Sequence, residues 1–241
     1  FSPSANTYLR RAKSNVQPGN IVDRNNILLA TTNAQGRRVY SSDPDIRKAV
    51  VHAVGDDVNN IAYGAESFMA NYLYAFNESY PELLVQALKG EKRRGNDIKL
   101  LIDSALSKRA YSLFPKGKSG ALIVMNYRTG EVLALQSYPS YDPMNLSQAD
   151  KDNPLKPFWN RATMWSSAPG SVFKVVTLAS ALKNIPDAQS KMYECLGALV
   201  VEDTTITDAN DAVHSMLNLR RALAVSCNIT FARVAMELGD A

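Results

Sequence analysis

Apolar positions at the start of the chain are arranged as short strands followed by helices. Residues 20–30 alternate around a turn and predict a strand, a turn and a second strand. Residues 44–90 are mostly helical in pattern, with apolar residues at helical spacing over 65–76. The charged stretch 90–95, which has a glycine at each end, is typical of a linker. We therefore expect a small N-terminal domain over residues 1–95.

A different pattern begins at residue 96 and continues to residue 241. In chain order it predicts a strand over 97–103, a helix over 104–113 that Ser104 could cap, a hairpin of strands 121–125 and 132–135, a loop over 139–157, a helix over 171–184, a strand over 198–201, and helices over about 216–225 and 227–238. This order predicts an α+β domain over 96–241, with helices packed on an antiparallel sheet.

Composition and charge narrow the class of protein. Of the 241 residues, 46% are hydrophobic and 21% are charged, which is ordinary for a chain that buries a core. Net charge is only +4, and the densest basic run, 89–94, also contains Glu91. This distribution argues against nucleic acid as the main partner, whereas a mildly basic surface near an anionic membrane remains possible.

Cysteine and histidine give little support for a metal or a catalytic triad. The chain has two cysteines, Cys195 and Cys227, whose spacing matches no zinc pattern. Its two histidines, His52 and His214, are far apart in sequence. We expect two buried thiols, with a single disulfide left open, and we expect no metal, no cofactor and no Ser-His-Asp site.

The stretch Ala168-Pro-Gly-Ser-Val-Phe-Lys174 carries the first candidate chemistry. Ser171 follows a turn signal and lies near a helix start, and Lys174 is three residues further, so both share one face. A buried lysine has a lowered pKa and can accept the serine proton, while a helix N-terminus favours an oxyanion. Taken alone, the pattern is far more typical of an ordinary helix cap followed by a surface lysine, because S-x-x-K occurs by chance in many proteins.

Ser226-Cys227-Asn228 carries the second candidate, at a predicted junction between helices. The hydroxyl of Ser226 and the amide of Asn228 are two residues apart, so both could point into one cleft. The alternative interpretation is a helix cap followed by a buried cysteine.

The two motifs together resemble those of the penicillin-binding proteins, whose signature combines S-x-x-K with an S-x-N motif and K-[ST]-G. Further resemblance lies in Asn160-Arg161-Ala162 ahead of the serine turn, and in residues 19–25, which are similar to the G-x-I-x-D-R-N box after the membrane anchor of class B members. The resemblance implies a penicillin-binding/serine β-lactamase-like transpeptidase domain, preceded by a small N-terminal pedestal domain.

The resemblance also implies roles for four residues. Ser171 would be the nucleophile of a peptidoglycan D,D-transpeptidase, Lys174 its general base, Ser226 a proton relay and Asn228 a donor to the substrate amide. The substrates implied are stem peptides ending in D-Ala-D-Ala, and β-lactams would acylate the same serine. Alternative functions for the same fold are a β-lactam sensor and a scaffold of the cell-wall machinery. A serine β-lactamase is a less favoured alternative.

Two parts of the family pattern are expected outside this sequence. No K-[ST]-G follows Asn228 before residue 241, although the family places that motif well downstream. The sequence has no run of eighteen apolar residues and no signal-peptide pattern. Since the class B members that it resembles carry a membrane anchor, the resemblance implies a single-pass anchor beyond this sequence. The resemblance then implies a site on the outer face of the bacterial cytoplasmic membrane, with the cell-wall synthesis machinery as partner.

Overall fold

The structure is a computed structural model in which residues 16–76, 88 and 93–239 are described. Its contacts separate into two compact units, residues 1–165 and residues 166–241. The predicted boundary at 95/96 falls inside the first unit. Strand β6 (Ile98–Lys99), on the C-terminal side of this boundary, pairs with β2 (Ile21–Val22), on its N-terminal side, so one sheet spans the boundary. The division into domains 1–95 and 96–241 stays a prediction.

The first unit contains a small mixed sheet and a long hairpin. Its strands are β1 (Val16–Gln17), β2 (Ile21–Val22), β3 (Leu28–Thr32), β4 (Arg38–Tyr40), β5 (Arg93–Arg94), β6 (Ile98–Lys99), β7 (Gly120–Met125) and β8 (Val132–Tyr138). The sheet has the order β4-β3-β2-β6, in which β3 is antiparallel to both neighbours and β2 is parallel to β6. Strands β7 and β8 form the predicted antiparallel hairpin, and β1 pairs with β5 in parallel.

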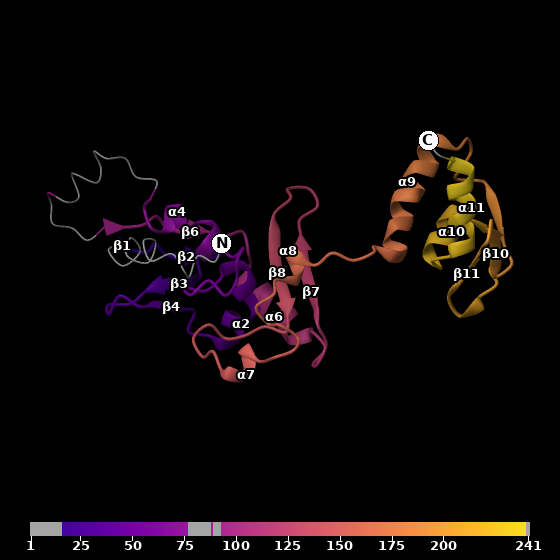
Figure 1. Cartoon of the computed structure of the whole chain (residues 1–241). Helices are drawn as coiled ribbons and strands as arrows, with labels where there is room; N and C mark the ends of the chain where they lie inside the picture. Colours follow the sequence, from indigo (N-terminus) through magenta and orange to yellow (C-terminus); the bar gives the residue numbers. More distant parts are fainter. Residues whose placement is uncertain (1–15, 77–87, 89–92, 240–241) are drawn as a thin grey trace. The chain divides into compact units, whose positions relative to one another are not determined.

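Helices α2 and α6 form the core of the first unit with these strands. The helices are α2 (Pro44–Val54), α3 (Ala65–Phe68), α4 (Ala70–Leu73), α6 (Ser104–Leu113), α7 (Gln148–Lys151) and α8 (Arg161–Met164). Helices α2 and α6 contact each other and both contact β8 (Figure 1). Buried residues of β3 and α2, among them Leu29 and Val50, belong to one hydrophobic cluster.

Three expectations for this unit need correction. The cap of α6 is Asp103, whose carboxylate accepts from the Leu106 N–H at 2.9 Å, whereas the Ser104 hydroxyl donates to Asp23. The helix expected over 65–76 is two short helices that meet at Met69. The strand expected over 97–103 is confined to β6, because the chain leaves the sheet to reach the Asp103 cap.

The second unit combines three helical segments with two antiparallel strand pairs. Its elements are η2 (a 3₁₀ turn, Gly170–Phe173), α9 (Lys174–Asn184), β9 (Met192–Cys195), β10 (Ala198–Val201), β11 (Thr204–Thr207), η3 (a 3₁₀ turn, Ala209–Asp211), β12 (Ser215–Asn218), α10 (Leu219–Ala224) and α11 (Asn228–Leu238). Strand β9 pairs with β12 and β10 pairs with β11. Helix α11 contacts both α9 and β9 (Figure 1).

The prediction that a helix begins at about Met216 was wrong. Residues 215–218 form β12 instead, because pairing with β9 satisfies their backbone groups and places Leu217 in the core. Leu217 is 6% exposed while its neighbour Met216 is 53% exposed, which is the period of a strand. The helix itself begins at Leu219, after Asn218 has capped it.

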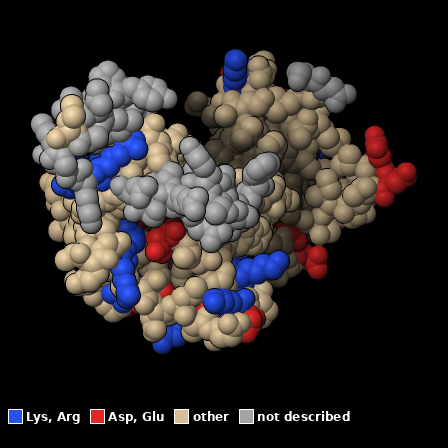
Figure 2. All heavy atoms as spheres, turned by 60° about the vertical axis from the view of Figure 1, so that its left-hand side comes forward, with Lys and Arg blue, Asp and Glu red and all other residues tan. Residues whose placement is uncertain are grey.

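The charged side chains on the visible face agree with the low net charge. On the face shown in Figure 2, the described Lys and Arg side chains are separated by neutral side chains and by Asp and Glu. In the described ranges, no helix has both the length and the apolar character needed to cross a bilayer.

Candidate active site

Ser171 lies on a 3₁₀ turn that leads into helix α9. Gly170 before it has φ +59°, a left-handed conformation that glycine adopts without the cost other residues meet. The α-helix begins only at Lys174, so the prediction of a helix from Ser171 is wrong by one tight turn. The spacing still places the two side chains together, with Lys174 Nζ 3.3 Å from Ser171 Oγ.

Ser226 and Asn228 reach the same place from the connection between α10 and α11. Ser226 has φ +55°, a left-handed conformation that is uncommon for a serine and typical of constrained sites. Asn228 is the first residue of α11, and its Nδ2 donates to the Thr207 carbonyl at 2.8 Å. That bond leaves Asn228 Oδ1 facing Lys174, at 2.5 Å from Nζ.

Lys174 is therefore the centre of the predicted site. It is only 9% exposed, and its Nζ lies 2.6 Å from the Ser226 carbonyl and 3.1 Å from Ser226 Oγ, in addition to the contacts with Ser171 and Asn228. All four sequence-predicted residues thus meet around one amine.

The contacts of Lys174 accommodate a neutral amine as well as an ammonium. The Ser226 carbonyl and Asn228 Oδ1 can only accept, so they take the two N–H groups of a neutral amine. Its lone pair is then left for the hydroxyl of Ser171 or of Ser226. Burial lowers the pKa of Lys174, and this effect outweighs the opposing attraction of the Asp208 carboxylate and the Cys227 sulfur.

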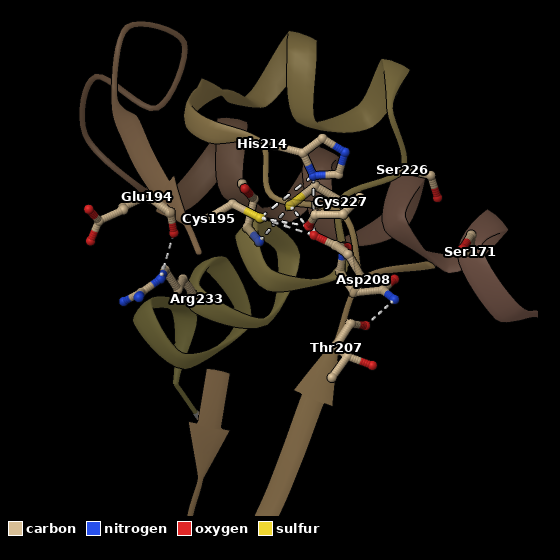
Figure 3. Close-up of polar contacts among 12 residues, drawn as sticks. Ser171, Glu194, Cys195, Thr207, Asp208, His214, Ser226, Cys227 and Arg233 are labelled. Carbon is tan, nitrogen blue, oxygen red and sulfur yellow. Dashed lines mark hydrogen bonds and ion pairs between the residues drawn. The ribbon is translucent and has the colours of Figure 1, made fainter. Parts of the chain in front are cut away.

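A second group of side chains, missed in the sequence, lies directly behind the Ser226-Cys227-Asn228 motif. Cys195, Asp208, His214 and Cys227 place their ligand-type atoms within 4.8 Å of one another. Figure 3 shows them converging, with Ser226 and Ser171 on one side of the group. The two cysteines are buried and free, as expected.

Strand pairing explains why the sequence did not reveal this group. His214 precedes Ser215, which is opposite Cys195 in the β9–β12 pair, so two residues distant in the chain become neighbours. Asp208 follows β11, and Cys227 is the N-cap of α11.

Asp208 links this group to the candidate active site. Its Oδ1 accepts the backbone N–H of Asn228, while its Oδ2 faces both cysteines and His214. Burial opposes its ionisation, but hydrogen bonds from the Cys195 thiol and from Asn228, among others, hold the pKa of Asp208 below its ordinary value. Burial also raises the pKa of Cys227 to about 11.

The Ser-x-x-Lys turn and the S-x-N loop lie within a region that matches a known family. The penicillin binding protein transpeptidase domain matches residues 120–241, slightly more than half of the chain. The chain belongs to the penicillin-binding protein transpeptidase family. This confirms the resemblance on which the sequence interpretation rested.

Several curated relatives of this chain are named as peptidoglycan transpeptidases or penicillin-binding proteins. The peptidoglycan D,D-transpeptidase PbpA of Mycolicibacterium smegmatis is 28% identical over 175 residues, which are 65% of this chain and 36% of that protein. Penicillin-binding protein 3 of Bacillus subtilis is 30% identical over 161 residues, 60% of this chain and 23% of that protein. The chain thus spans about a third or less of the length of these relatives.

Solved structures confirm the predicted fold. Penicillin-binding protein A of M. tuberculosis, in an imipenem acyl-enzyme complex, has a TM-score of 0.78 at 24% identity, covering 94% of this chain and 57% of that one. PBP2 of Pseudomonas aeruginosa, in complex with WCK 5153, has a TM-score of 0.73 at 25% identity, covering 92% and 52%. The fold is therefore the α+β fold of penicillin-binding transpeptidases.

Proposed function

We propose that the protein is a class B peptidoglycan D,D-transpeptidase that acts through an acyl-enzyme on Ser171. The observation that carries this proposal is the position of Lys174 Nζ, within 3.3 Å of the Ser171 hydroxyl and held by two acceptors that orient its lone pair. Membership of the family and the names of the relatives support the same reaction.

In the acylation step, Ser171 attacks the carbonyl carbon of the penultimate D-Ala of a stem peptide. Lys174 takes the hydroxyl proton as the Oγ–C bond forms, and the carbonyl oxygen becomes an oxyanion. The Ser171 N–H lies in the first turn of η2, where backbone N–H groups have no earlier helical partner, and serves as one oxyanion donor. The peptide C–N bond then breaks and D-Ala leaves as the amine.

The other two residues complete the proton path and hold the substrate. Ser226 Oγ, 3.1 Å from Lys174 Nζ, passes a proton to the departing D-Ala nitrogen. Asn228 donates to the substrate amide. An amine of a neighbouring stem peptide then attacks the ester, forms the cross-link and returns the proton. A β-lactam acylates Ser171 by opening its ring, so its leaving amine stays attached.

The wider setting follows from the substrate. Peptidoglycan lies outside the cytoplasmic membrane, so the proposed place of action is the outer face of that membrane, with a single-pass anchor outside this sequence. The pedestal role of residues 1–95, a K-[ST]-G motif downstream and association with cell-wall synthesis machinery belong to the same proposal.

An acyl-exchange assay on the intact protein tests the reaction. A synthetic stem pentapeptide ending in D-Ala-D-Ala is incubated with a labelled acceptor amine, and products are followed by mass. We expect the exchanged peptide with the wild type, none with Ser171→Ala, and wild-type yield with Ser190→Ala, a matched change at an exposed serine of the same unit.

Three results would contradict the proposal. Exchange that survives Ser171→Ala excludes Ser171 as the nucleophile. Rapid hydrolysis of penicillin without exchange indicates a β-lactamase. A stable acyl-enzyme that never transfers to an amine indicates a sensor.

A further inference from the structure

Phe231, on the helix that begins at Asn228, lies beside the amine of Lys174. Its ring centroid is 6.0 Å from Lys174 Nζ. Phe231 is three residues after Asn228 on α11, so the two side chains share one face of that helix. The phenylalanine is 5% exposed, and no step of the proposed acyl transfer uses it. The ring therefore belongs to the wall around the amine as well as to the core.

The polar and the apolar neighbours of this amine lie on different residues. The described oxygen atoms that hydrogen bond to Lys174 Nζ belong to Ser171, Ser226 and Asn228. Phe231 belongs instead to a buried hydrophobic cluster, against which Leu178 also packs, one turn after Lys174 on α9. The amine thus has a polar side that faces the reacting hydroxyls and an apolar side that the ring closes.

Two titratable groups of the described residues act on this amine without hydrogen bonding to it. The Asp208 carboxylate, which follows β11, and the Cys227 sulfur, which caps α11, both favour the charged amine. His214 lies at Asp208, 3.2 Å from its carboxylate, and not at the amine. All three are the same in every variant described below, so they cannot cause a difference between the variants.

We propose that Phe231 is a positioning residue for acylation, whose ring closes the apolar side of the Lys174 amine and keeps water away from it. A water molecule on that side would stabilise the ammonium and would compete with Ser171 for the lone pair of the neutral amine. With the ring in place, the hydroxyls of Ser171 and Ser226 are the proton partners left to the amine. The inference rests on the proposed function, because it deepens the role given there to Lys174.

The ring acts on the amine in two opposite ways. By excluding water it favours the neutral amine, whereas the negative face of an aromatic ring attracts an ammonium. This attraction is small at a centroid distance of 6.0 Å, which is at the outer limit for such pairs. Burial lowers the pKa of Lys174 in spite of it. Exclusion of water is therefore the larger effect.

Phe231→Val tests this role. The side-chain volume that it removes exceeds the roughly 30 Å³ that a water molecule occupies in the liquid, and the oxygens around Nζ offer that water hydrogen bonds. Water beside Nζ raises the pKa of Lys174 towards the ordinary 10.5, so less neutral amine is present at neutral pH. We expect the pH profile of penicillin acylation to move up by at least about half a unit, which slows acylation at neutral pH about threefold. Penicillin affinity and the maximal rate at high pH are expected to stay near the wild-type values.

Two further variants separate this role from packing. Phe231→Met refills the space of the ring with a flexible apolar chain and is expected to restore the wild-type profile. Val234→Ala removes buried volume from the same helix, in a different cluster, and is expected to lower the melting temperature without moving the profile. An equal shift in Val234→Ala, or no shift in a folded Phe231→Val protein, overturns the proposal. A shift to lower pH in Phe231→Met also overturns it, because attraction to the ring would then govern the amine.

A less disruptive variant covers the case in which Phe231→Val does not fold. Phe231→Ile removes less volume and costs less stability. Its branch at Cβ leaves the far end of the space of the ring empty, so a smaller shift to higher pH is expected. A folded Phe231→Ile protein with the wild-type profile overturns the proposal.

A direct titration separates this inference from the proposed function. In intact protein with ¹³C-labelled lysine, the Cε signal of Lys174, assigned with Lys174→Arg, is followed by NMR against pH without any acylation. A pKa of Lys174 that rises in Phe231→Val supports the exclusion of water by Phe231 even if no variant reacts with penicillin, and that lack of reaction then contradicts the proposed function alone. Equal pKa values in wild-type and Phe231→Val proteins that both acylate refute the role of Phe231 and leave the proposed function standing.

Discussion

Replacing Lys174 with arginine tests the assignment of the base. Arginine keeps the positive charge and the hydrogen bonding capacity but remains protonated at every pH at which a protein is stable. Lys174 Nζ is 3.3 Å from Ser171 Oγ and 3.1 Å from Ser226 Oγ, so no other described amine or imidazole of this unit is placed to take the proton. Loss of a general base slows a reaction by about 10²–10⁴-fold. At about 1.36 kcal/mol per tenfold, this raises the acylation barrier by roughly 2.7–5.4 kcal/mol.

The same substitution also lowers the stability of the fold. The Ser226 carbonyl and Asn228 Oδ1 lose well-placed N–H donors, and a buried acceptor without a partner costs about 1–3 kcal/mol. The variant is therefore expected to fold, with a lower melting temperature. A folded protein with acylation slowed by two orders of magnitude or more separates the loss of the base from a loss of structure.

The pH profile makes the test sharper. Burial lowers the pKa of Lys174 from the ordinary 10.5, so the neutral amine forms at lower pH than in an exposed lysine. Wild-type acylation by a fluorescent penicillin is expected to rise with pH through that lowered pKa, and the rise is expected to vanish in Lys174→Arg. Lys183→Arg, at the exposed far end of α9, is expected to keep both rate and profile. A Lys174→Arg protein that acylates near the wild-type rate refutes the assignment.

Three further substitutions test the local structure. Gly170→Ala places a side chain at φ +59° without any clash, so it should destabilise by about 1–2 kcal/mol in urea unfolding, and unchanged stability would contradict the turn. Glu66→Gln removes the charge that faces the buried Arg38 at 2.6 Å and should cost about 3–5 kcal/mol in thermal unfolding; a loss below 1 kcal/mol on the same scale would contradict burial of the pair. Asp142 is buried, but the two hydrogen bonds from Arg47 hold its pKa below 3.8. Asp142→Asn should therefore be less stable than the wild type at neutral pH, and the two stabilities should become equal only as pH falls through that lowered pKa. A difference in stability that does not depend on pH would contradict this.

Elements built from local contacts could be predicted from the sequence. Helix α6 and the β7–β8 hairpin have nearly the predicted bounds, because apolar spacing and a tight turn determine them locally. The contact between Ser171 and Lys174 was also predictable, since it depends only on residues three apart in one helical turn.

Features that depend on distant pairing could not be predicted in this way. Strand β12 has the composition of a helix start, and only its partner β9 makes it extended. The buried group of Cys195, Asp208, His214 and Cys227 draws on residues from 195 to 227, which no local spacing rule connects. The approach of the Ser226 loop to Lys174 was expected from family resemblance, because nothing in residues 171–228 alone requires it.

The most direct test of the central claim, that Ser171 is an activated nucleophile, is a mass measurement. The full-length protein is incubated with penicillin G, its intact mass is recorded before and after, and the modified peptide is sequenced. The account predicts one equivalent of penicillin bound as an ester on Ser171. A folded, full-length protein that remains unmodified, or that carries the adduct on another residue, would contradict it.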